Sequence, residues 1–590
     1  MKKTFLLSCL MLAAMPVMAA YTGHVYVDKN KNGVFDQSEK PLAGIKVSDG
    51  LNVVETAADG SFTLPGHERE RFIFITTPSG YKTFNRHYHK IEKKQSGYDF
   101  GLIPYSGRIR KDGSHRYIHI TDTEIFNTEN HADWVNNVHD YARNEQAAFI
   151  IHTGDICYEK GLKAHIKLMN TENMDCPVFY CIGNHDLVKG KYGEELFESI
   201  YGPVYYSFDA GNVHYVVTPM PGGDHAPGYT SDDVCRWLKN DLAHIRPGTP
   251  VVVFNHDLLT YEDTFIFKSK NAGSINLNEY NLKAWVYGHW HINYMKKQGD
   301  VYSVCTSSLD KGGIDHSTTA FRVMHVDSKG DFTSELRYTY LDKNICIASP
   351  AGVMASGVLP VAVNVYSSVS PVREVLYTCL ADGKPVLKNK RLLQSTDWSW
   401  NGELPLSHKY VGKELTLRVT ARFNNGEIAE AESNFICRTE KTVPLFSADW
   451  DNLSGNAKHS APVSAPLNLP LQLAWTNNVG ANLYMTSPLI HKGKVIVASV
   501  DEDLKGAGHV YALNGKDGTI LWSCPVRNSI KNSIAVDSGI VFAQDAQGFL
   551  YAIDTETGKL CWEKQLPVNG LPALIDGLVA GEGVVYAGTG

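Results

Sequence analysis

Four short clusters of polar residues, each placed after an apolar run, contain the side chains best suited to chemistry. One of them is Gly183-Asn184-His185-Asp186, which follows the apolar run 178–182. The others supply the remaining candidates, which are Asp122, Glu124, Asp155, His289 and His291, and His256 follows a further apolar run. Short apolar runs are typical of buried strands, and α/β sheets place their chemistry at the carboxyl ends of strands. We therefore expect these side chains to meet at one edge.

The donor types in this set predict a divalent-metal site. Carboxylate, amide and imidazole groups together suit ions of hard to borderline character. Two such ions about 4 Å apart, joined by a bridging carboxylate, can clamp the attacking and leaving oxygens of a phosphoryl group and acidify a water between them. A nearby histidine that is not a ligand can protonate the leaving group. The set therefore predicts metal-dependent phosphoryl chemistry.

The surrounding residues, from 116 to about 342, alternate between strand and helix patterns. Apolar runs at 117–120, 148–151, 251–254 and 285–287 lead to Asp122, Asp155, His256 and His289 in turn. Helices are expected at 132–146 and after Ser231, which we expect to be a helix cap. His119 and His152 lie inside strands and are expected to be core residues. This stretch is predicted to be an α/β domain.

Gly154-Asp155, Gly183-Asn184-His185-Asp186, His256 and Gly288-His289-Trp290-His291, in this order and spacing, resemble the calcineurin-like metallophosphoesterase family. The resemblance covers roughly residues 115–345. It implies a two-sheet β-sandwich flanked by helices, with a dinuclear metal site at the strand ends. It also implies hydrolysis of phosphate mono- or diesters by a metal-bound hydroxide.

The resemblance also implies a role for each motif residue. Asp155 would bridge two divalent ions (Mn, Fe, Mg or Zn). Asn184, His256 and His289 would complete one site, and Asp122 and His291 would serve the other. His185 would be the general acid that orients the phosphate, paired with Asp186.

The chain departs from the family pattern at one ligand position. The first motif of the family usually reads Asp-x-His, whereas this chain has Asp122-Thr123-Glu124. An added anionic oxygen should favour Mn²⁺, Mg²⁺ or iron over Zn²⁺. The alternative is a weak or empty site, in which case the chain would be a surface or periplasmic binding protein with a degenerate phosphoesterase domain.

Residues 1–20 have the pattern of a signal peptide. Lys2 and Lys3 precede an apolar run at 5–17, and Met18-Ala19-Ala20 offers small residues for cleavage. We therefore expect a bacterial protein that is periplasmic or secreted. No later stretch is apolar and long enough to predict a transmembrane helix.

Composition excludes some partners and leaves the thiol chemistry open. The net charge is −7 over 590 residues, without a basic run, so no nucleic-acid surface is expected. The eleven cysteines form no CxxC pairs, which argues against a zinc cluster. Disulfides Cys176–Cys181 or Cys379–Cys437 and buried free thiols are both open.

Two β-sandwiches are expected to flank the α/β domain, which we place at residues 109–343. The first covers 21–108 and contains a loop whose oxygen spacing fits a twelve-residue calcium site. Its candidate ligands are Asp28, Asn30, Asn32, Asp36 and Glu39. A strand precedes this loop where an EF-hand would have a helix, so a polar hairpin is the alternative. The second sandwich covers 344–440 and contains no catalytic cluster.

Residues 441–590 begin as a linker and continue as a repeat. Tyr511-Ala512-Leu513-Asn514 recurs forty residues later as Tyr551-Ala552-Ile553-Asp554, and Trp522 recurs as Trp562. A period near 40 predicts propeller blades, and these resemble the pyrroloquinoline-quinone type, without a quinone being expected. Two and a fraction blades fit, whereas closure needs about four to eight. We therefore expect a partial propeller from a fragment, or an open array, that binds a protein or glycan partner.

Overall fold

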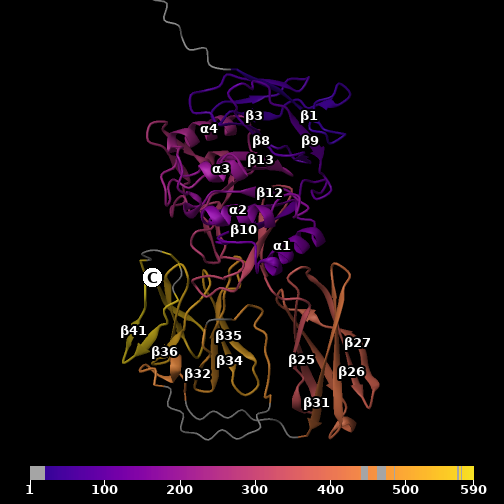
Figure 1. The fold of residues 1–590 in the computed structure, drawn as a ribbon. Coiled ribbons are helices and arrows are strands. Elements are labelled where there is room, and N and C mark those ends of the chain that lie inside the picture. The colour runs from indigo at the N-terminus through magenta and orange to yellow at the C-terminus, as the bar shows by residue number, and fades with distance from the viewer. Residues whose placement is uncertain are drawn as a thin grey trace, which may run out of the picture.

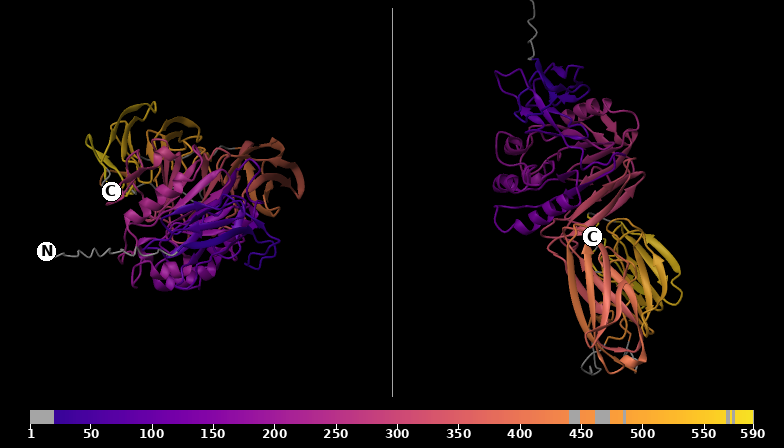
Figure 2. Two further views of the ribbon diagram at one scale, coloured as in Figure 1. Left: turned by 90° about the horizontal axis from the view of Figure 1, so that it is seen from above. Right: turned by 90° about the vertical axis from the view of Figure 1, so that its right-hand side faces the viewer.

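The computed structural model describes residues 20–439, 449–460, 473–483, 486–567, 571–572 and 575–589. The predicted signal peptide, apart from Ala20, and most of the predicted linker lie outside these residues. Figure 1 shows the N-terminal module at the top, a central module beneath it, and two further β modules side by side at the bottom. The right-hand view of Figure 2 shows the same two lower modules side by side beneath the central module. The predicted multidomain α/β and all-β architecture is confirmed.

The N-terminal module consists of two small sheets around one core, as expected. One sheet has the order β2-β1-β9-β7, with β5 paired to β1, and the other has the order β4-β3-β6-β8. The strands are β1 (Tyr21–Val27), β2 (Lys40–Pro41), β3 (Lys46–Ser48), β4 (Val53–Glu55), β5 (Ser61–Leu64), β6 (Phe72–Ile75), β7 (Tyr81–Thr83), β8 (Tyr88–Lys90) and β9 (Phe100–Pro104). Val25, Phe62 and Phe100 are buried between them.

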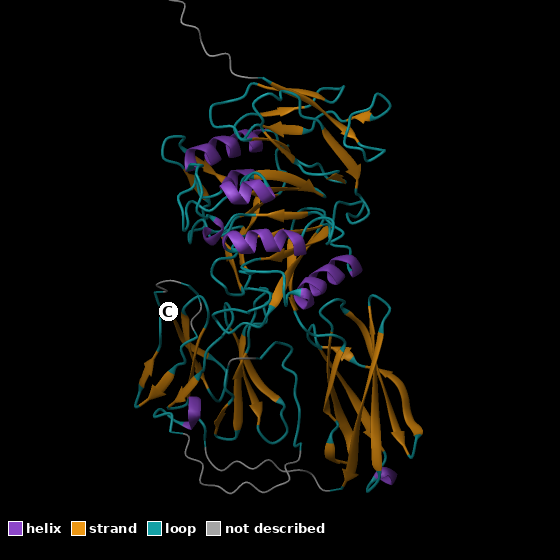
Figure 3. Ribbon diagram, in the orientation of Figure 1, coloured by secondary structure: helices purple, strands orange, loops and turns teal. Residues whose placement is uncertain are grey.

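The central module is a two-sheet sandwich, and the four α-helices of the described residues all belong to it (Figure 3). The first sheet has the order β12-β11-β10-β21-β22. Its strands are β10 (His115–Ile120), β11 (Phe149–His152), β12 (Val178–Tyr180), β21 (Ala320–Val326) and β22 (Phe332–Tyr338). The second has the order β13-β14-β15-β18-β20-β19. Its strands are β13 (Tyr206–Ala210), β14 (Val213–Val217), β15 (Val251–Phe254), β18 (Leu282–Tyr287), β19 (Tyr294–Gln298) and β20 (Val301–Cys305).

Helices cover the outer faces of this sandwich. They are α1 (Ala132–Asn144), α2 (Tyr158–Leu168), α3 (Glu195–Tyr201) and α4 (Ser231–Ala243). Trp134, Val138 and Tyr141 of α1 are buried in the core of the first sheet, which confirms the predicted apolar face. The expected cap of α4 was wrong by one residue. Thr230 accepts a hydrogen bond from the Asp233 N–H (3.2 Å), and Asp233 answers by accepting from the Thr230 N–H (2.9 Å).

Strand register brings the candidate residues to one edge. In the first sheet Ile120 pairs with His152, and His152 pairs with Tyr180, all in parallel strands. In the second, Val217 pairs with Phe254 and Phe254 pairs with Val286. Because these parallel strands end together, the loops that follow them converge at one edge of the sandwich.

The C-terminal sandwich also has two sheets, in the orders β23-β25-β29-β28 and β24-β31-β30-β26-β27. Its strands are β23 (Asn344–Ser349), β24 (Gly352–Ala355), β25 (Gly357–Tyr366), β26 (Val372–Ala381), β27 (Lys384–Arg391), β28 (Leu393–Gln394), β29 (Ser399–Leu406), β30 (Glu414–Phe423) and β31 (Ile428–Arg438). Val363, Tyr377 and Leu417 lie in the core that the alternating strands form.

Within its described residues, the repeat region forms two four-stranded blades and a further two-stranded sheet. The first blade contains β32 (Leu489–His491), β33 (Lys494–Ala498), β34 (His509–Asn514) and β35 (Ile520–Pro525). The second contains β36 (Ala535–Asp537), β37 (Ile540–Gln544), β38 (Phe549–Asp554) and β39 (Leu560–Gln565). The two-stranded sheet contains β40 (Val579–Gly581) and β41 (Val584–Tyr586). Indole Nε1 groups link the repeats, from Trp475 to the Gly515 carbonyl (2.9 Å) and from Trp522 to the Thr555 carbonyl (3.0 Å).

Of the two alternatives left open for the cysteines, the structure has free thiols. All ten cysteines of the described residues are free, and Cys176, Cys181, Cys379 and Cys437 are buried. They therefore act as small apolar residues of the cores. Among the described helices, none is long and apolar enough to cross a membrane.

Candidate metal centre

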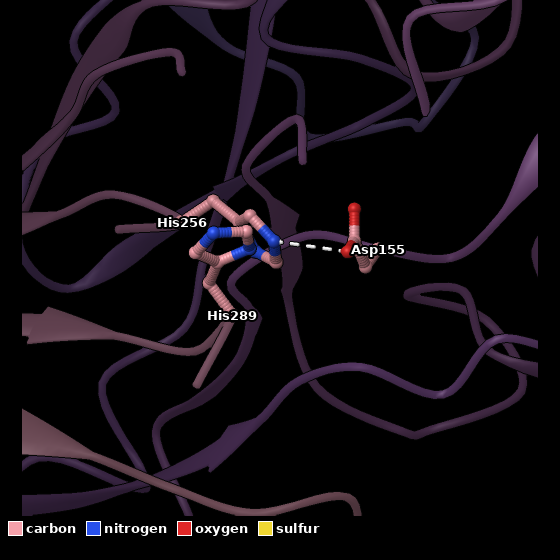
Figure 4. Close-up of side chains that lie close together, drawn as sticks. All are labelled: Asp155, His256 and His289. Carbon is pink, nitrogen blue, oxygen red and sulfur yellow. Dashed lines mark ion pairs between the residues drawn. The ribbon is translucent and has the colours of Figure 1, made fainter. Parts of the chain in front are cut away.

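Three of the predicted ligands form the centre of the cluster at the strand ends. Asp155 follows β11, His256 follows β15 and His289 follows β18. Figure 4 shows these three side chains pointing toward one another. One ligand atom from each lies within 4.8 Å of the others, and His256 Nε2 is 3.1 Å from Asp155 Oδ2. The geometry therefore gathers donors from both sheets around one point.

Three buried atoms of the cluster make no hydrogen bond among the described residues. They are Asp122 Oδ1, Asn184 Oδ1 and His256 Nε2. Asp122 Oδ1 and His256 Nε2 instead make ion-pair contacts inside the cluster, with His291 Nε2 (3.3 Å) and Asp155 Oδ2 (3.1 Å). Asp122 and His256 are fully buried. A buried acceptor without a hydrogen bond, such as Asn184 Oδ1, costs roughly 1–3 kcal/mol. Bound divalent cations would satisfy these atoms, so these residues fit the metal that their types predict.

The second half of the cluster surrounds Asp122. His291 Nε2 lies 3.3 Å from Asp122 Oδ1 and 3.5 Å from Glu124 Oε1. The other oxygen of Glu124 pairs with Lys311 Nζ at 2.8 Å. Lys311 was not among the predicted residues. The positive charge of Lys311 balances the negative charge that Glu124 adds. The one sequence signal for Lys311 is its place in the loop 306–317.

Charge coupling sets the protonation of this cluster. Burial opposes ionisation of Asp155, but His256 lowers the pKa of Asp155 to about 2. Burial also opposes the charge on His256, and Asp155 nevertheless raises the pKa of His256 to about 10. Burial and the positive charge of His256 together lower the pKa of His289. His289 therefore presents a neutral imidazole, which is the form that binds metals.

Backbone strain is concentrated at the same residues. Asp122, Glu124, Asp155, His289 and His291 all have positive φ, between 43° and 64°. Left-handed conformations at residues other than glycine cost free energy and cluster at functional sites. These sharp turns direct the five side chains back over the strand ends.

His185 lies at the rim of the cluster, beside a partner that was not predicted. Its backbone N–H donates to Asp155 Oδ1 (3.0 Å), and its Nδ1 lies 2.9 Å from Asp224 Oδ2. Burial lowers the pKa of His185, but the hydrogen bond to Asp224 outweighs it and the pKa is raised. Asp224 lies in the loop after β14, a position at the same strand edge that could have suggested it.

The predicted pairing of His185 with Asp186 is wrong. The Asp186 carboxylate is buried and accepts the backbone N–H groups of Gly183 and Cys157, both at 2.9 Å. Burial and the charge of Asp155 raise the pKa of Asp186 to about 7. Asp186 therefore holds the turn that carries Asn184 and His185, instead of contacting the imidazole.

Comparison with known families agrees with this geometry. Residues 115–293 match the family model described as calcineurin-like phosphoesterase, and residues 29–104 match the N-terminal region of the same family. The central module, which contains the matched residues 115–293, is therefore a calcineurin-like phosphoesterase domain. Residues 472–590 match the model described as outer membrane protein assembly factor BamB, which agrees with the repeats in the blades.

One curated relative of this chain is purple acid phosphatase 13 of Arabidopsis thaliana. It is 26% identical over 215 residues, which are 34% of this chain and 36% of that protein. The chain therefore spans about a third of the length of this relative.

Several solved structures match part of the chain at low identity. A predicted phosphoesterase from Streptococcus pneumoniae TIGR4 is 10% identical and covers 38% of this chain and 98% of its own (TM-score 0.19). BamB from Moraxella catarrhalis is 13% identical and covers 47% and 77% (TM-score 0.15). The quinohemoprotein alcohol dehydrogenase ADHIIG from Pseudomonas putida HK5 is 20% identical and covers 24% and 23% (TM-score 0.21). These scores are low, so the fold assignment rests on the strands described above.

Outside the phosphoesterase domain, the loop expected to bind calcium closes on itself. Asp28 accepts the N–H groups of Asn32 (3.2 Å) and Gly33 (3.0 Å). Glu39 accepts the Lys29 N–H (2.9 Å), and Asp36 accepts the side-chain amides of Asn30 and Asn32. The five residues surround one loop, an arrangement that suits both a cation site and a polar hairpin. Calcium binding stays a prediction.

Proposed function

We propose that this protein hydrolyses phosphate esters at a dinuclear metal centre. The observation that carries the proposal is the convergence of Asp155, His256 and His289, whose ligand atoms lie within 4.8 Å of one another. Asn184, His256 and His289 would hold one divalent ion, and Asp122, Glu124 and His291 would hold the other. Asp155 would serve both.

The chain's own groups would carry the rest of the reaction. Divalent ions at these residues would neutralise the phosphate charge and acidify a water molecule. His185 stands at the open rim and donates a proton to the leaving oxygen. Asp224 keeps His185 protonated by accepting its Nδ1–H, and also orients the ring. General acid catalysis of this kind is worth roughly 10²–10⁴-fold in rate.

Two aromatic rings beside His185 favour a planar leaving group. Tyr158 lies 5.4 Å from His185 between ring centroids, and Phe126 stacks on Tyr158 at 6.2 Å. Both rings are exposed, Phe126 by 58%. A planar group can stack on such a platform. We expect Tyr158→Ala to raise KM several-fold for an aryl phosphate while an alkyl phosphate is hydrolysed unchanged. Equal effects on both esters would contradict this prediction.

The first experiment is a metal-dependent assay. Purified protein would be loaded in turn with Mn²⁺, Mg²⁺, Fe²⁺ and Zn²⁺ and given an aryl phosphate monoester and a diester. Turnover that needs metal and is lost in Asp155→Ala supports the proposal and shows which ester is preferred. A folded protein that hydrolyses neither ester with any metal would favour a binding protein with a degenerate phosphoesterase domain.

Glu124 provides a test of metal preference. Glu124→His restores the usual donor of the family but leaves Lys311 without its anionic partner. We expect the variant to shift its preference toward Zn²⁺, since imidazole is the softer donor. An unchanged metal preference and rate would show that Glu124 does not act as a ligand.

We also propose that the protein is exported, because its first twenty residues have a positive start, a short apolar run and small residues at the end. The blades would then serve as a surface for a protein or glycan partner outside the cytoplasm. Cell fractionation tests the first point, since a protein found wholly in the cytoplasm with residues 1–20 intact would refute it.

A further inference from the structure

A lysine from the blades is buried against the phosphoesterase domain. Lys531 lies in the connection between β35 and β36, and only 3% of it is exposed. Buried lysines are rare unless they are paired. Its Nζ lies 2.5 Å from Asp315 Oδ2 and 2.8 Å from Glu502 Oε1, and it donates to the Asn293 carbonyl at 2.8 Å. The three partners account for the three protons of the ammonium group.

These partners come from both sides of the interface. Glu502 belongs to the connection between β33 and β34, so it is part of the same blade array as Lys531. Asn293 and Asp315 belong to the phosphoesterase domain, and both are buried. Burial opposes the charge on Lys531, but Glu502 and Asp315 outweigh it and raise the pKa of the lysine. The ammonium group therefore stays charged at the interface.

Lys531 contacts two loops of the phosphoesterase domain. These loops carry His291, a proposed metal ligand, and Lys311, the ion-pair partner of Glu124. Asn293 is two residues after His291, and Asp315 is four residues after Lys311, which pairs with Glu124. The loops are joined by hydrogen bonds from the Ile314 N–H to the His291 carbonyl (2.9 Å) and from the Ser307 N–H to Asn293 Oδ1 (3.0 Å). Lys531 bonds to both loops and so adds a connection from the blades to these two hydrogen bonds.

We propose that Lys531 is a positioning residue through which the blade array completes one of the two metal sites, the site of Asp122, Glu124 and His291. This inference rests on the proposed function for the identity of the site. It makes a separate claim, that one metal site depends on the blades while the other, built by Asp155, Asn184, His256 and His289, does not. Residues outside the direct ligands typically change metal affinity by about 10–100-fold.

The test is a metal titration of the full chain, independent of turnover. Metal-stripped protein would be titrated with Mn²⁺ by calorimetry, and electron paramagnetic resonance would distinguish coupled from isolated ions. In Lys531→Met we expect one of two binding events to weaken by at least about tenfold, with the other unchanged and the coupled signal lost. Asn528→Ala is the matched control, because its side chain donates to the Met295 carbonyl (3.0 Å) across the same interface without contacting either loop partner of Lys531.

A second variant covers the case in which Lys531→Met does not fold. Glu502→Gln combined with Lys531→Met removes one charge of each sign and leaves Asp315 with its hydrogen bond from the Ser317 N–H (3.1 Å). It should show the same selective loss of one site. Two unchanged binding events, or equal weakening of both, in either folded variant would overturn the inference. Because metal binding is the readout, the result stands even if no phosphate ester is hydrolysed.

Discussion

At the scale of single residues, His256 carries a proton that a bound metal must displace. Asp155 raises the pKa of His256 to about 10 against the opposing effect of burial. Metal ligation needs the neutral imidazole, so binding releases this proton below that pKa. The apparent metal affinity should therefore rise by about tenfold for each pH unit above neutral pH. It should level off above the pKa of His256.

Calorimetry in two buffers of different ionisation enthalpy measures this proton. Binding at neutral pH should release about one proton. The apparent binding enthalpies in the two buffers should therefore differ by about the difference between the ionisation enthalpies of the buffers. His256→Gln should remove that difference. A wild-type enthalpy that does not depend on the buffer would show that His256 is already neutral.

The contact between His185 and Asp224 predicts a pH effect on turnover. The hydrogen bond raises the pKa of His185, so the acid form persists to higher pH. Asp224→Asn should lower that pKa and move the alkaline limb of the kcat profile to lower pH. The loss should reach about tenfold on the alkaline side if the pKa falls by one unit. Bound metal should be unchanged, and a profile that only scales down without shifting would contradict the prediction.

At the scale of elements, the turn after β12 leaves no room for a side chain at Gly183. A Cβ there would lie 2.2 Å from Asp155 Oδ1 and 2.3 Å from the Asp155 nitrogen. Gly183→Ala should therefore displace the Asp155 carboxylate and weaken metal binding by at least about tenfold. Metal content by mass spectrometry measures the effect. Gly107→Ala is the matched control, since nothing lies within 4 Å of its added Cβ, and equal metal content in both variants would refute the claim.

The strand-end ligands could be predicted from the sequence because two simple regularities place them. Apolar runs mark buried strands, and parallel register makes their ends coincide, so Asp122, Asp155 and His256 were placed from local pattern alone. Asp224 and Lys311 follow no such period. They reach the site through irregular loops, whose paths depend on tertiary packing. The same reason explains why the partner of His185 was misassigned to its neighbour in sequence.

At the scale of the whole molecule, a second buried ion pair joins the blades to the phosphoesterase domain. Arg322 of β21 is fully buried and pairs with Asp503 at 2.6 Å. No sequence pattern predicts this contact, because Arg322 and Asp503 are 181 residues apart. Both this pair and Lys531 lie in the interface, so the two modules share buried charge as well as apolar surface.

Asp503→Ala should destabilise both modules together. The change leaves the Arg322 guanidinium buried without its carboxylate, which typically costs about 3–5 kcal/mol. We expect the blades and the phosphoesterase domain to unfold in one transition, and we expect its midpoint to fall in the variant. Scanning calorimetry measures this transition. Lys413→Ala, which removes a surface pair with Asp382 (3.5 Å) in the C-terminal sandwich, is the control. Two separate transitions, only one of them shifted, would mean that the modules are independent.

The reactivity of the free cysteines can be used to measure how each module opens. Eight of the ten described thiols are buried, at least one in each of the phosphoesterase domain, the C-terminal sandwich and the blades, and only Cys346 and Cys561 are exposed. A thiol reagent should therefore label two sites at once and the other eight only as each module opens. Mass spectrometry of the labelled peptides would then give separate opening rates for three modules from one sample, without an engineered probe.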